Sequence, residues 1–216
     1  MEVRDPRKTI LDKIQTVRDS QEDRGTASFP KFRHDSSLYL PASEETREME
    51  FARNLVRVKG KFIYCLNRTE LVQALKTLFQ EERWKKVFCS ESIAGDLIAR
   101  SGITYTSDYE AVMDNEVAVT GCEYLIARTG SIMVSSAQGS GRRVFGHTPV
   151  HIVIGKSSQL VDEISDALTG IKNNYSDMPS QVSLITGPSR TADIEKTLVI
   201  GAHGPRDLYV FLLKDR

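Results

Sequence analysis

Short apolar runs alternate with segments of helical periodicity through most of this chain, and this alternation restricts its fold more than any other feature. Strands separated by helices of about ten residues are joined by crossover connections, so they lie parallel in one sheet. The sequence therefore predicts an α/β protein with a Rossmann-like layered sheet that is largely parallel. The expected strands are 62–66, 85–89, 116–120, 124–127, 131–134, 151–154, 182–185 and 208–213.

Apolar residues at spacings of three and four predict the helices between these strands. The first is expected to begin at the potential N-cap Ser43, to run to about Lys59 and to end at Gly60. Its expected apolar face is Met49, Ala52, Leu55 and Val56. The other expected helices are 69–82, 91–100 and 159–168.

The first forty residues differ from the rest of the chain. Residues 7–18 have the spacing of an amphipathic helix, whereas 19–41 carry Gly25, Pro30 and Pro41 and no periodicity. We therefore expect residues 1–42 to form an N-terminal helix and an extended arm, followed by an α/β domain over 43–216. An arm of this kind can wrap a neighbouring copy in a homo-oligomer.

Composition excludes several classes of protein. The 216 residues suit one well-buried core, and 29 Lys and Arg balance 29 Asp and Glu, so no overall field attracts nucleic acid or a membrane surface. No run reaches the roughly 18–20 apolar residues that a membrane span needs, and the N-terminus lacks the apolar core of a signal peptide. A cytoplasmic location is expected.

The cysteine pattern argues against a metal site formed by this chain alone. Cys65, Cys89 and Cys122 are far apart and none belongs to a C-x-x-C pair, so neither a zinc ribbon nor an iron–sulfur cluster is expected. Cys65 and Cys89 lie in apolar runs and are interpreted as buried free thiols. We expect no metal and no cofactor in this chain.

Several short stretches resemble functional motifs but lack a required residue. Lys156 follows a strand as in a P-loop, but the required earlier glycine is missing, so it is interpreted as a turn residue. Residues 139–144 begin like a dinucleotide fingerprint but lack the third glycine, which leaves a flexible loop or a mobile basic lid. His147 and His151 are four apart, but Pro149 between them excludes the helical spacing of a metal pair. Hydrolase and metalloprotease motifs are also absent.

Two bends near the C-terminus concentrate unusual residue types. One follows strand 182–185, and residues 191–198 after it are predicted to start a helix whose N-terminus can bind an anion. Arg190 can pair with a phosphate or carboxylate, and Asp193 and Glu195 either bind ligand or stabilise the helix start. The second bend is 201–206, where His203 can transfer a proton and Arg206 adds charge.

A third bend joins strands 124–127 and 131–134. Its Thr-Gly-Ser sequence at 129–131 can present a glycine to a ligand at strand ends of a parallel sheet, or can simply form a hairpin turn. We keep both interpretations. The candidate ligand-binding residues from the three bends are Thr129, Gly130, Ser131, Gly187, Ser189, Arg190, Thr191, Asp193, Glu195, His203, Gly204 and Arg206.

The amino-acid sequence of the C-terminal bends resembles that of a known family. Residues 185–195 read Ile-Thr-Gly-Pro-Ser-Arg-Thr-Ala-Asp-Ile-Glu and residues 197–206 read Thr-Leu-Val-Ile-Gly-Ala-His-Gly-Pro-Arg. Together with the bend at 127–132 and the strand entry at 149–151, they resemble the LUD-domain family, and within it the lactate-utilisation protein C branch. The resemblance covers most of the chain, and 19–45 least.

This resemblance implies a fold similar to the NagB/RpiA/CoA-transferase-like group. It also implies an accessory or substrate-binding subunit of a system that oxidises L-lactate to pyruvate, with iron–sulfur clusters in partner subunits. The subunit is expected to bind a small anionic ligand; the resemblance supplies no catalytic residue. One alternative is a self-contained isomerase or transferase acting on a sugar-phosphate, nucleotide or acyl-CoA. Another is a structural scaffold that grips a partner with its arm and first helix.

Overall fold

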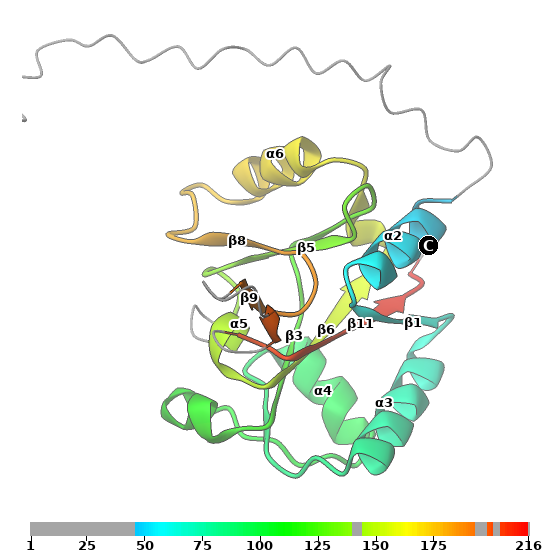
Figure 1. The fold of residues 1–216 in the computed structure, drawn as a ribbon, viewed down its shortest axis with the longest axis vertical. Coiled ribbons are helices and arrows are strands. Elements are labelled where there is room, and N and C mark those ends of the chain that lie inside the picture. The colour runs from blue at the N-terminus through cyan, green and yellow to red at the C-terminus, as the bar shows by residue number, and fades with distance from the viewer. Residues whose placement is uncertain (1–45, 140–143, 193–197, 201–203, 216) are drawn as a thin grey trace, which may run out of the picture. The chain divides into compact units, whose positions relative to one another are not determined.

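A five-stranded parallel sheet forms the centre of the protein (Figure 1). The computed structural model describes residues 46–139, 144–192, 198–200 and 204–215. The strand order is β1-β11-β6-β3-β2, and every neighbouring pair is parallel. The strands are β1 (Lys61–Cys65), β2 (Val87–Phe88), β3 (Val117–Thr120), β6 (Val150–Lys156) and β11 (Asp207–Leu213). We call the edge where they begin the amino edge and the edge where they end the carboxyl edge.

Each face of this sheet is covered by a different layer (Figure 1). Helices α3 (Arg68–Glu82) and α4 (Ser92–Arg100) cover one face. The other face packs on α2 (Arg47–Arg57) and on a second sheet of order β7-β4-β5-β8. Helix α6 (Ile164–Asn174) packs on the second sheet. The strands of the second sheet are β4 (Tyr124–Ile126), β5 (Ser131–Ser135), β7 (Leu160–Val161) and β8 (Val182–Ile185).

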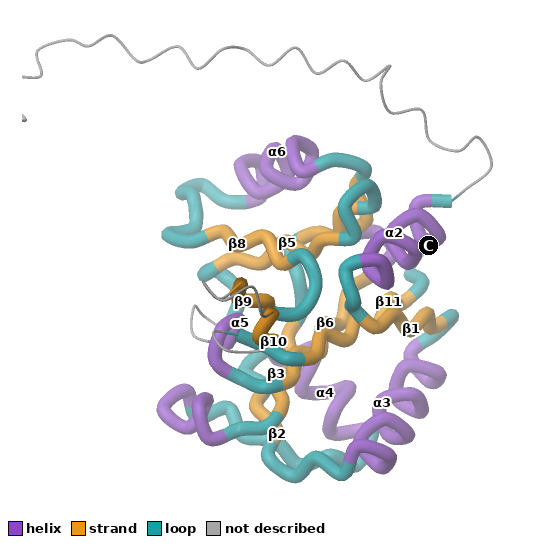
Figure 2. The backbone as a smooth tube through the Cα atoms, in the orientation of Figure 1, coloured by secondary structure: helices purple, strands orange, loops and turns teal. Residues whose placement is uncertain are grey.

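Short elements complete the described part of the chain. They are the 3-10 helices η2 (Tyr109–Asp114) and η3 (Ser157–Gln159), the one-turn helix α5 (Val144–His147), and the antiparallel hairpin of β9 (Arg190–Ala192) and β10 (Leu198–Ile200). Figure 2 shows this hairpin between the two sheets and beside α5.

The central strands are mostly apolar, as expected for strands with both faces buried. Along β6 and β11, Ile152 and Phe211 belong to the core under α3 and α4, while Val153 and Val210 belong to the core under α2 and the second sheet. Full burial of one such side chain stabilises the fold by about 1.5–3 kcal/mol. The alternation therefore sets the register of each strand.

The predicted fold class is confirmed: the chain is α/β, with a parallel sheet between helices. All eight expected strands are present, and α3 buries Leu71 and Leu75 as the helical spacing predicted. The three cysteines are buried free thiols. The predicted N-terminal helix over 7–18 and the arm over 19–41 lie outside the described residues.

The expected first helix is displaced along the chain. The N-cap of α2 is Thr46, whose side chain accepts a hydrogen bond from Met49 N, rather than Ser43, which lies outside the described residues. The predicted apolar face was also wrong in part, because Met49 and Val56 are 59% and 56% exposed. Leu55 is buried as predicted, together with Phe51 and Asn54, and the Asn54 amide donates to the carbonyl oxygens of residues 127 and 128.

The helix expected over 159–168 was wrong in its first half. Leu160 pairs with Leu125 as part of β7, and Gln159 accepts a hydrogen bond from Lys156 N and donates to the carbonyl of Cys122. These contacts hold residues 157–161 against the sheets, so α6 begins only at Ile164. Leu160 was predicted to lie on the apolar face of the helix, but it is buried as part of β7.

Helix α2 approaches two bends closely enough that only glycine fits in them. A Cβ on Gly130 would lie 2.2 Å from Leu55 N, and a Cβ on Gly187 would lie 2.2 Å from Val58 O. Both glycines have positive φ, 63° and 81°. The backbone of α2 and of the residue that follows it is therefore in direct contact with the backbones of both bends.

We expect Gly130→Ala to lower the free energy of unfolding by roughly 2–4 kcal/mol, because the methyl group clashes with α2 and disfavours the positive φ. Chemical denaturation of both proteins measures this difference. Gly146→Ala is the matched control, because nothing lies within 4 Å of a Cβ at that position. Equal stability of the two variants would contradict the described contact.

His151 on β6 is a fully buried neutral histidine whose tautomer follows from its neighbours. The Thr120 hydroxyl donates its single proton to the carbonyl of Gly121 at 2.9 Å, so its oxygen accepts from His151 Nε2 at 2.8 Å. The ring proton therefore lies on Nε2. Nδ1 is buried and has no hydrogen-bond partner among the described residues. Burial lowers the pKa of His151 from 6.5 to about 4.

This lowered pKa predicts a stability loss in mild acid. Below about pH 6.5 His151 is protonated in the unfolded chain but stays neutral in the folded chain. The free energy of unfolding therefore decreases as the pH falls from about 6.5 to about 4, where the folded chain is protonated as well. The loss is about 3 kcal/mol for a pKa difference of this size. Denaturation of His151→Gln, which retains a donor to Thr120, should show a flatter profile over this range. A profile of His151→Gln identical to that of the unmodified chain would contradict the assignment.

Candidate functional site

The structure brings the three predicted bends together through a continuous set of contacts. The Ser131 hydroxyl is 2.8 Å from that of Thr186, and Ser189 N donates to the carbonyl of Pro205 at 2.8 Å. A Cβ on Gly204 would lie 3.0 Å from the Cβ of Ser189. The Pro149 carbonyl, at the start of β6, accepts from Arg206 N. The bends therefore meet at the amino edge of the parallel sheet.

The chain itself fills much of the space that was expected to hold a ligand. Gly130 and Gly187 do admit a close approach, but the approaching backbone is that of α2 and Val58. The bend at 129–131 is a hairpin turn between the antiparallel strands β4 and β5, and it also follows the end of β4 where β4 pairs in parallel with β7. Thr129 Oγ1 is buried without a partner among the described residues.

The helix predicted over 191–198 was wrong in its described parts. Residues 190–192 form β9 and pair with 198–200 of β10, so neither segment is helical. β-branched residues, Thr191, Val199 and Ile200, suit a strand better than a helix. The exposed Arg190 donates from Nη2 to Val58 O at 2.9 Å. Asp193, Glu195 and His203 lie outside the described residues, and their roles stay predictions.

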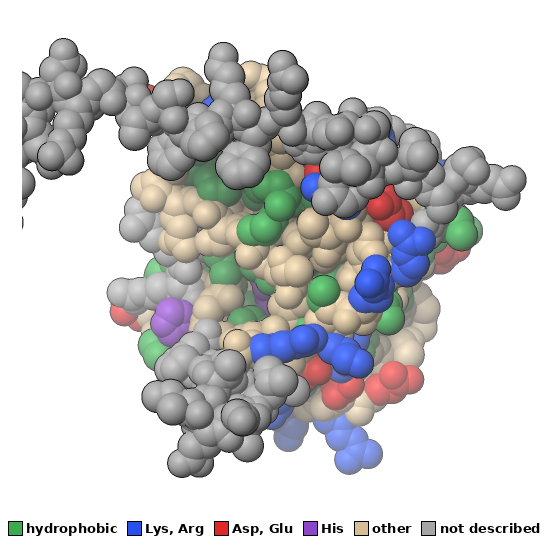
Figure 3. All heavy atoms as spheres, turned by 45° about the horizontal axis from the view of Figure 1, so that its top comes forward, with side chains coloured by type: hydrophobic (Ala, Val, Ile, Leu, Met, Phe, Trp, Pro, Cys, Tyr) green, Lys and Arg blue, Asp and Glu red, His purple; other side chains and the backbone are tan. Residues whose placement is uncertain are grey.

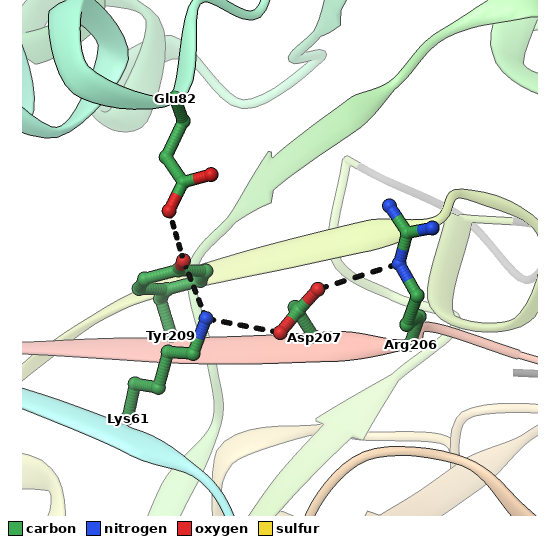
Figure 4. A network of polar contacts seen from close by, with 5 residues as sticks. All are labelled: Lys61, Glu82, Arg206, Asp207 and Tyr209. Atoms are coloured by element: carbon green, nitrogen blue, oxygen red, sulfur yellow. Dashed lines mark hydrogen bonds and ion pairs between the residues drawn. The ribbon is translucent and has the colours of Figure 1, made fainter. Parts of the chain in front are cut away.

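Arg206 belongs to a network of polar side chains across the amino edge (Figure 4). Asp207 lies 3.5 Å from Arg206 Nε and 3.0 Å from Lys61 Nζ, and Lys61 also donates to the Tyr209 hydroxyl at 2.7 Å. Tyr209 in turn donates to Glu82. Burial opposes the charge of Lys61, but the contacts with Tyr209 and Asp207 prevail and raise its pKa. Arg206 is thus already paired within the chain.

The opposite, carboxyl edge of the sheet holds a small pocket of about 190 Å³ that the sequence did not predict. Ligands of open α/β sheets bind outside the carboxyl ends of the strands, where loop residues from several strands meet. The pocket lies where β3, β6 and β11 end, beside α4. Its lining is Arg68, Glu91, Ile93, Ala94, Asp96, Leu97, Gly121, Cys122, Ile154, Lys156, Gln159 and Leu213.

Glu91 is the best-oriented acid of this pocket. Gly121 N donates to Glu91 Oε2 at 2.8 Å, and a Cβ at residue 121 would lie only 2.7 Å from that oxygen. A glycine is therefore needed for the carboxylate to approach the end of β3. Glu91 precedes α4, and its side chain does not cap the free N–H groups of that helix. It is held toward β3 and lines the pocket.

The neighbouring thiols are not nucleophiles at neutral pH. Burial raises the pKa of Cys89 to about 11, and the Glu91 carboxylate contributes to the shift. Burial, with a further contribution from Glu91, also raises the pKa of Cys122, which forms part of the pocket wall. Both sulfurs remain protonated, so the reactive thiolate form is absent.

The rest of the polar lining is two cations, Lys156 and Arg68, with a second acid, Asp96, and the amide of Gln159. Lys156 is the last residue of β6, and Arg68 is the first residue of α3. The apolar side chains of Leu97, Ile154 and Leu213 supply the rest of the wall. The arrangement offers an acceptor for a ligand O–H or N–H group, cations for a carboxylate, and apolar contact for a short carbon chain. Lys156, interpreted from sequence as a turn residue, is therefore part of the pocket.

The described residues form neither a membrane-spanning helix nor a metal-binding group. None of their helices is both long enough and apolar enough to cross a membrane. None of their His, Cys, Asp and Glu side chains form a group of three or more that could hold a metal ion.

Comparisons with known proteins connect this fold to a family. The uncharacterized protein NMB1437 of Neisseria meningitidis is 29% identical over 184 residues, which are 79% of this chain and 78% of that protein. Lactate utilization protein C of Bacillus subtilis is 35% identical over 103 residues, 46% of this chain and 43% of that protein. The corresponding protein of Bacillus licheniformis is 34% identical over the same shares. The match thus spans less than half of these two relatives.

A solved structure has the same fold. The crystal structure of a DUF162 family protein from Deinococcus radiodurans superposes with a TM-score of 0.59 at 16% identity, covering 81% of this chain and 99% of that one. The family model described as the LUD domain matches residues 48–213. Because this match covers most of the chain, the protein belongs to the LUD domain family.

Proposed function

We propose that this protein is a substrate-binding accessory component of a lactate-utilisation system and that its carboxyl-edge pocket binds a 2-hydroxycarboxylate such as L-lactate. The assignment to a lactate-utilisation system is supported by relatives named Lactate utilization protein C. The observation that carries the ligand assignment is the pocket, which combines Glu91, Lys156, Arg68 and a short apolar wall. The electrons from lactate pass to separate iron–sulfur partner proteins in the cytoplasm.

The chemistry of the pocket suggests how such a ligand is oriented. Lys156 and Arg68 neutralise the ligand carboxylate, and Leu97, Ile154 and Leu213 contact its methyl group. The Glu91 carboxylate, held by Gly121 N, accepts a hydrogen bond from the 2-hydroxyl group. Pyruvate has a keto oxygen in place of that hydroxyl, and the keto oxygen faces Glu91 without a proton to share. The pocket therefore distinguishes an alcohol from a ketone.

We expect the isolated full chain to bind L-lactate at least tenfold more tightly than pyruvate, measured by ligand-observed NMR or calorimetry. Glu91→Gln should abolish this preference, because its amide can donate to the keto oxygen. Lys156→Met should weaken lactate binding by roughly tenfold or more, as expected for a lost charged hydrogen bond of about 1.5–3 kcal/mol. Lys172→Met, an exposed lysine on α6, is the control.

Two results would contradict the location of the ligand. The first is lactate binding that is unchanged in both Glu91→Gln and Lys156→Met but lost in Arg190→Gln and Arg206→Gln, which would return the ligand to the predicted bends. The second is tighter binding of a sugar-phosphate, nucleotide or acyl-CoA than of lactate, which would favour a self-contained isomerase or transferase. The pocket volume of about 190 Å³ is small for the latter two ligands.

The role in the system has its own test. Lactate-dependent dye reduction is measured with purified iron–sulfur lactate-utilisation proteins, with and without this chain. We expect dye reduction to require the chain and to fall in the Glu91→Gln variant. Full activity in the absence of the chain would overturn its assignment to the system, whatever the pocket binds.

A further inference from the structure

Cationic side chains gather at the amino edge of a chain that has no net charge. The chain carries 29 basic and 29 acidic residues in total. Exposed cations nevertheless follow one another from the second half of α2 into β1 and recur in the two C-terminal bends. We name the set the amino-edge basic patch: Arg53, Arg57, Lys59, Lys61, Arg190 and Arg206. Figure 3 shows Lys and Arg side chains in a band on one face of the molecule.

Described contacts connect the members of this patch. Arg53 and Arg57 are one helical turn apart on α2. The guanidinium of Arg190 reaches the carbonyl of Val58, the residue between Arg57 and Lys59. The bend of Arg190 contacts the bend of Arg206 through Ser189 N and Pro205 O. The cations therefore share one surface although they come from distant parts of the sequence.

Acids offset part of this charge: Glu50 precedes Arg53 by three residues on α2, and Asp207 lies beside two other cations. Asp207 lies within 3.5 Å of Arg206 and of Lys61, so it neutralises about one of the two cations beside it (Figure 4). The patch retains a clear excess of positive charge over Arg57, Lys59 and Arg190. Lys61, Arg190 and Arg206 also make contacts within the chain, whereas Arg57 and Lys59 are exposed on the surface.

The same surface includes two large exposed apolar side chains. Met49 and Val56 are 59% and 56% exposed, and with Arg53 they follow the four- and three-residue spacing of one helix face. This face points outward because α2 buries its other face, which carries Phe51, Asn54 and Leu55, in the core. Methionine and arginine are enriched in protein–protein interfaces. Apolar residues framed by arginines suit a protein surface better than a nucleic acid, which requires mainly cations.

We infer that the outward face of α2 and the amino-edge basic patch form a docking surface for an acidic partner protein. Complementary charge speeds the encounter and selects the partner, and Met49 and Val56 supply the apolar contact. The pocket lies at the opposite edge of the sheet, so a partner docked here leaves the pocket free to exchange its ligand. The inference rests on the proposed function only for the choice of partners in the test.

The test is binding of the full chain to each purified iron–sulfur lactate-utilisation protein, measured by calorimetry at several salt concentrations. We expect Arg57→Glu/Lys59→Glu to weaken the complex at least tenfold, and the unmodified complex to weaken with added salt. Lys76→Glu/Lys172→Glu, which reverses two exposed lysines elsewhere, should bind normally. Met49→Asp/Val56→Asp should also weaken the complex, even at high salt. Circular dichroism checks that every variant is folded.

Several results would overturn this inference. One is equal binding by the patch and control variants. Another is tighter binding of oligo(dT) or of vesicles with anionic lipids than of either protein. A change of oligomeric state in the patch variant would assign the surface to a second copy. The Met49→Asp/Val56→Asp variant provides a further test. If it binds the partner normally but shows altered hydrogen exchange in residues 1–45, the surface is assigned to the chain's own N-terminal segment.

These outcomes are separable from those of the proposed function. The Arg57→Glu/Lys59→Glu variant should bind L-lactate as the unmodified chain does, because neither residue lines the pocket. Patch-dependent docking without any lactate binding would leave the docking surface intact and reject the ligand. Lactate binding without patch-dependent docking would support the ligand assignment and reject the docking surface.

Discussion

The position of β11 inside the parallel sheet, between β1 and β6, connects most of the described structure. This strand, the last of those described, pairs with both neighbours along its length. Its burial on both faces joins the two apolar cores, one under α3 and α4 and the other under α2 and the second sheet. Its ends also reach both regions for which we propose a function: Asp207 begins it in the amino-edge network, and Leu213 ends it in the pocket wall.

Strands and layers could be predicted from the sequence because burial on two faces leaves a direct pattern, an unbroken apolar run. The helices were harder. Met49 and Val56 fit an apolar face as well as Phe51 did, and only the hydrogen bonds from Asn54 to residues 127 and 128 show which face is inward. Leu160 matched a helical spacing, but its partner is Leu125 on β4. Such contacts are made between distant segments and leave no local periodicity.

The candidate site shows the same limit. Gly130 admits a close neighbour as predicted, but that neighbour is the backbone of α2, and Gly187 is approached in the same way by Val58. The pocket was missed because Glu91, Gly121 and Lys156 come from three segments, each unremarkable alone. A useful signal was nevertheless present: each residue follows or ends an expected parallel strand, where loops converge on one edge.

The pairing of the first described strand with the last one affects how the chain is made. Lys61 on β1 contacts Tyr209 on β11 across 148 residues of sequence. Pairings this distant close a long loop and slow folding. During synthesis Lys61 of β1 leaves the ribosome 148 residues before Tyr209 of its partner strand. Until then its unpaired edge is open to wrong pairing, with Lys59 and Lys61 as the charges that discourage it.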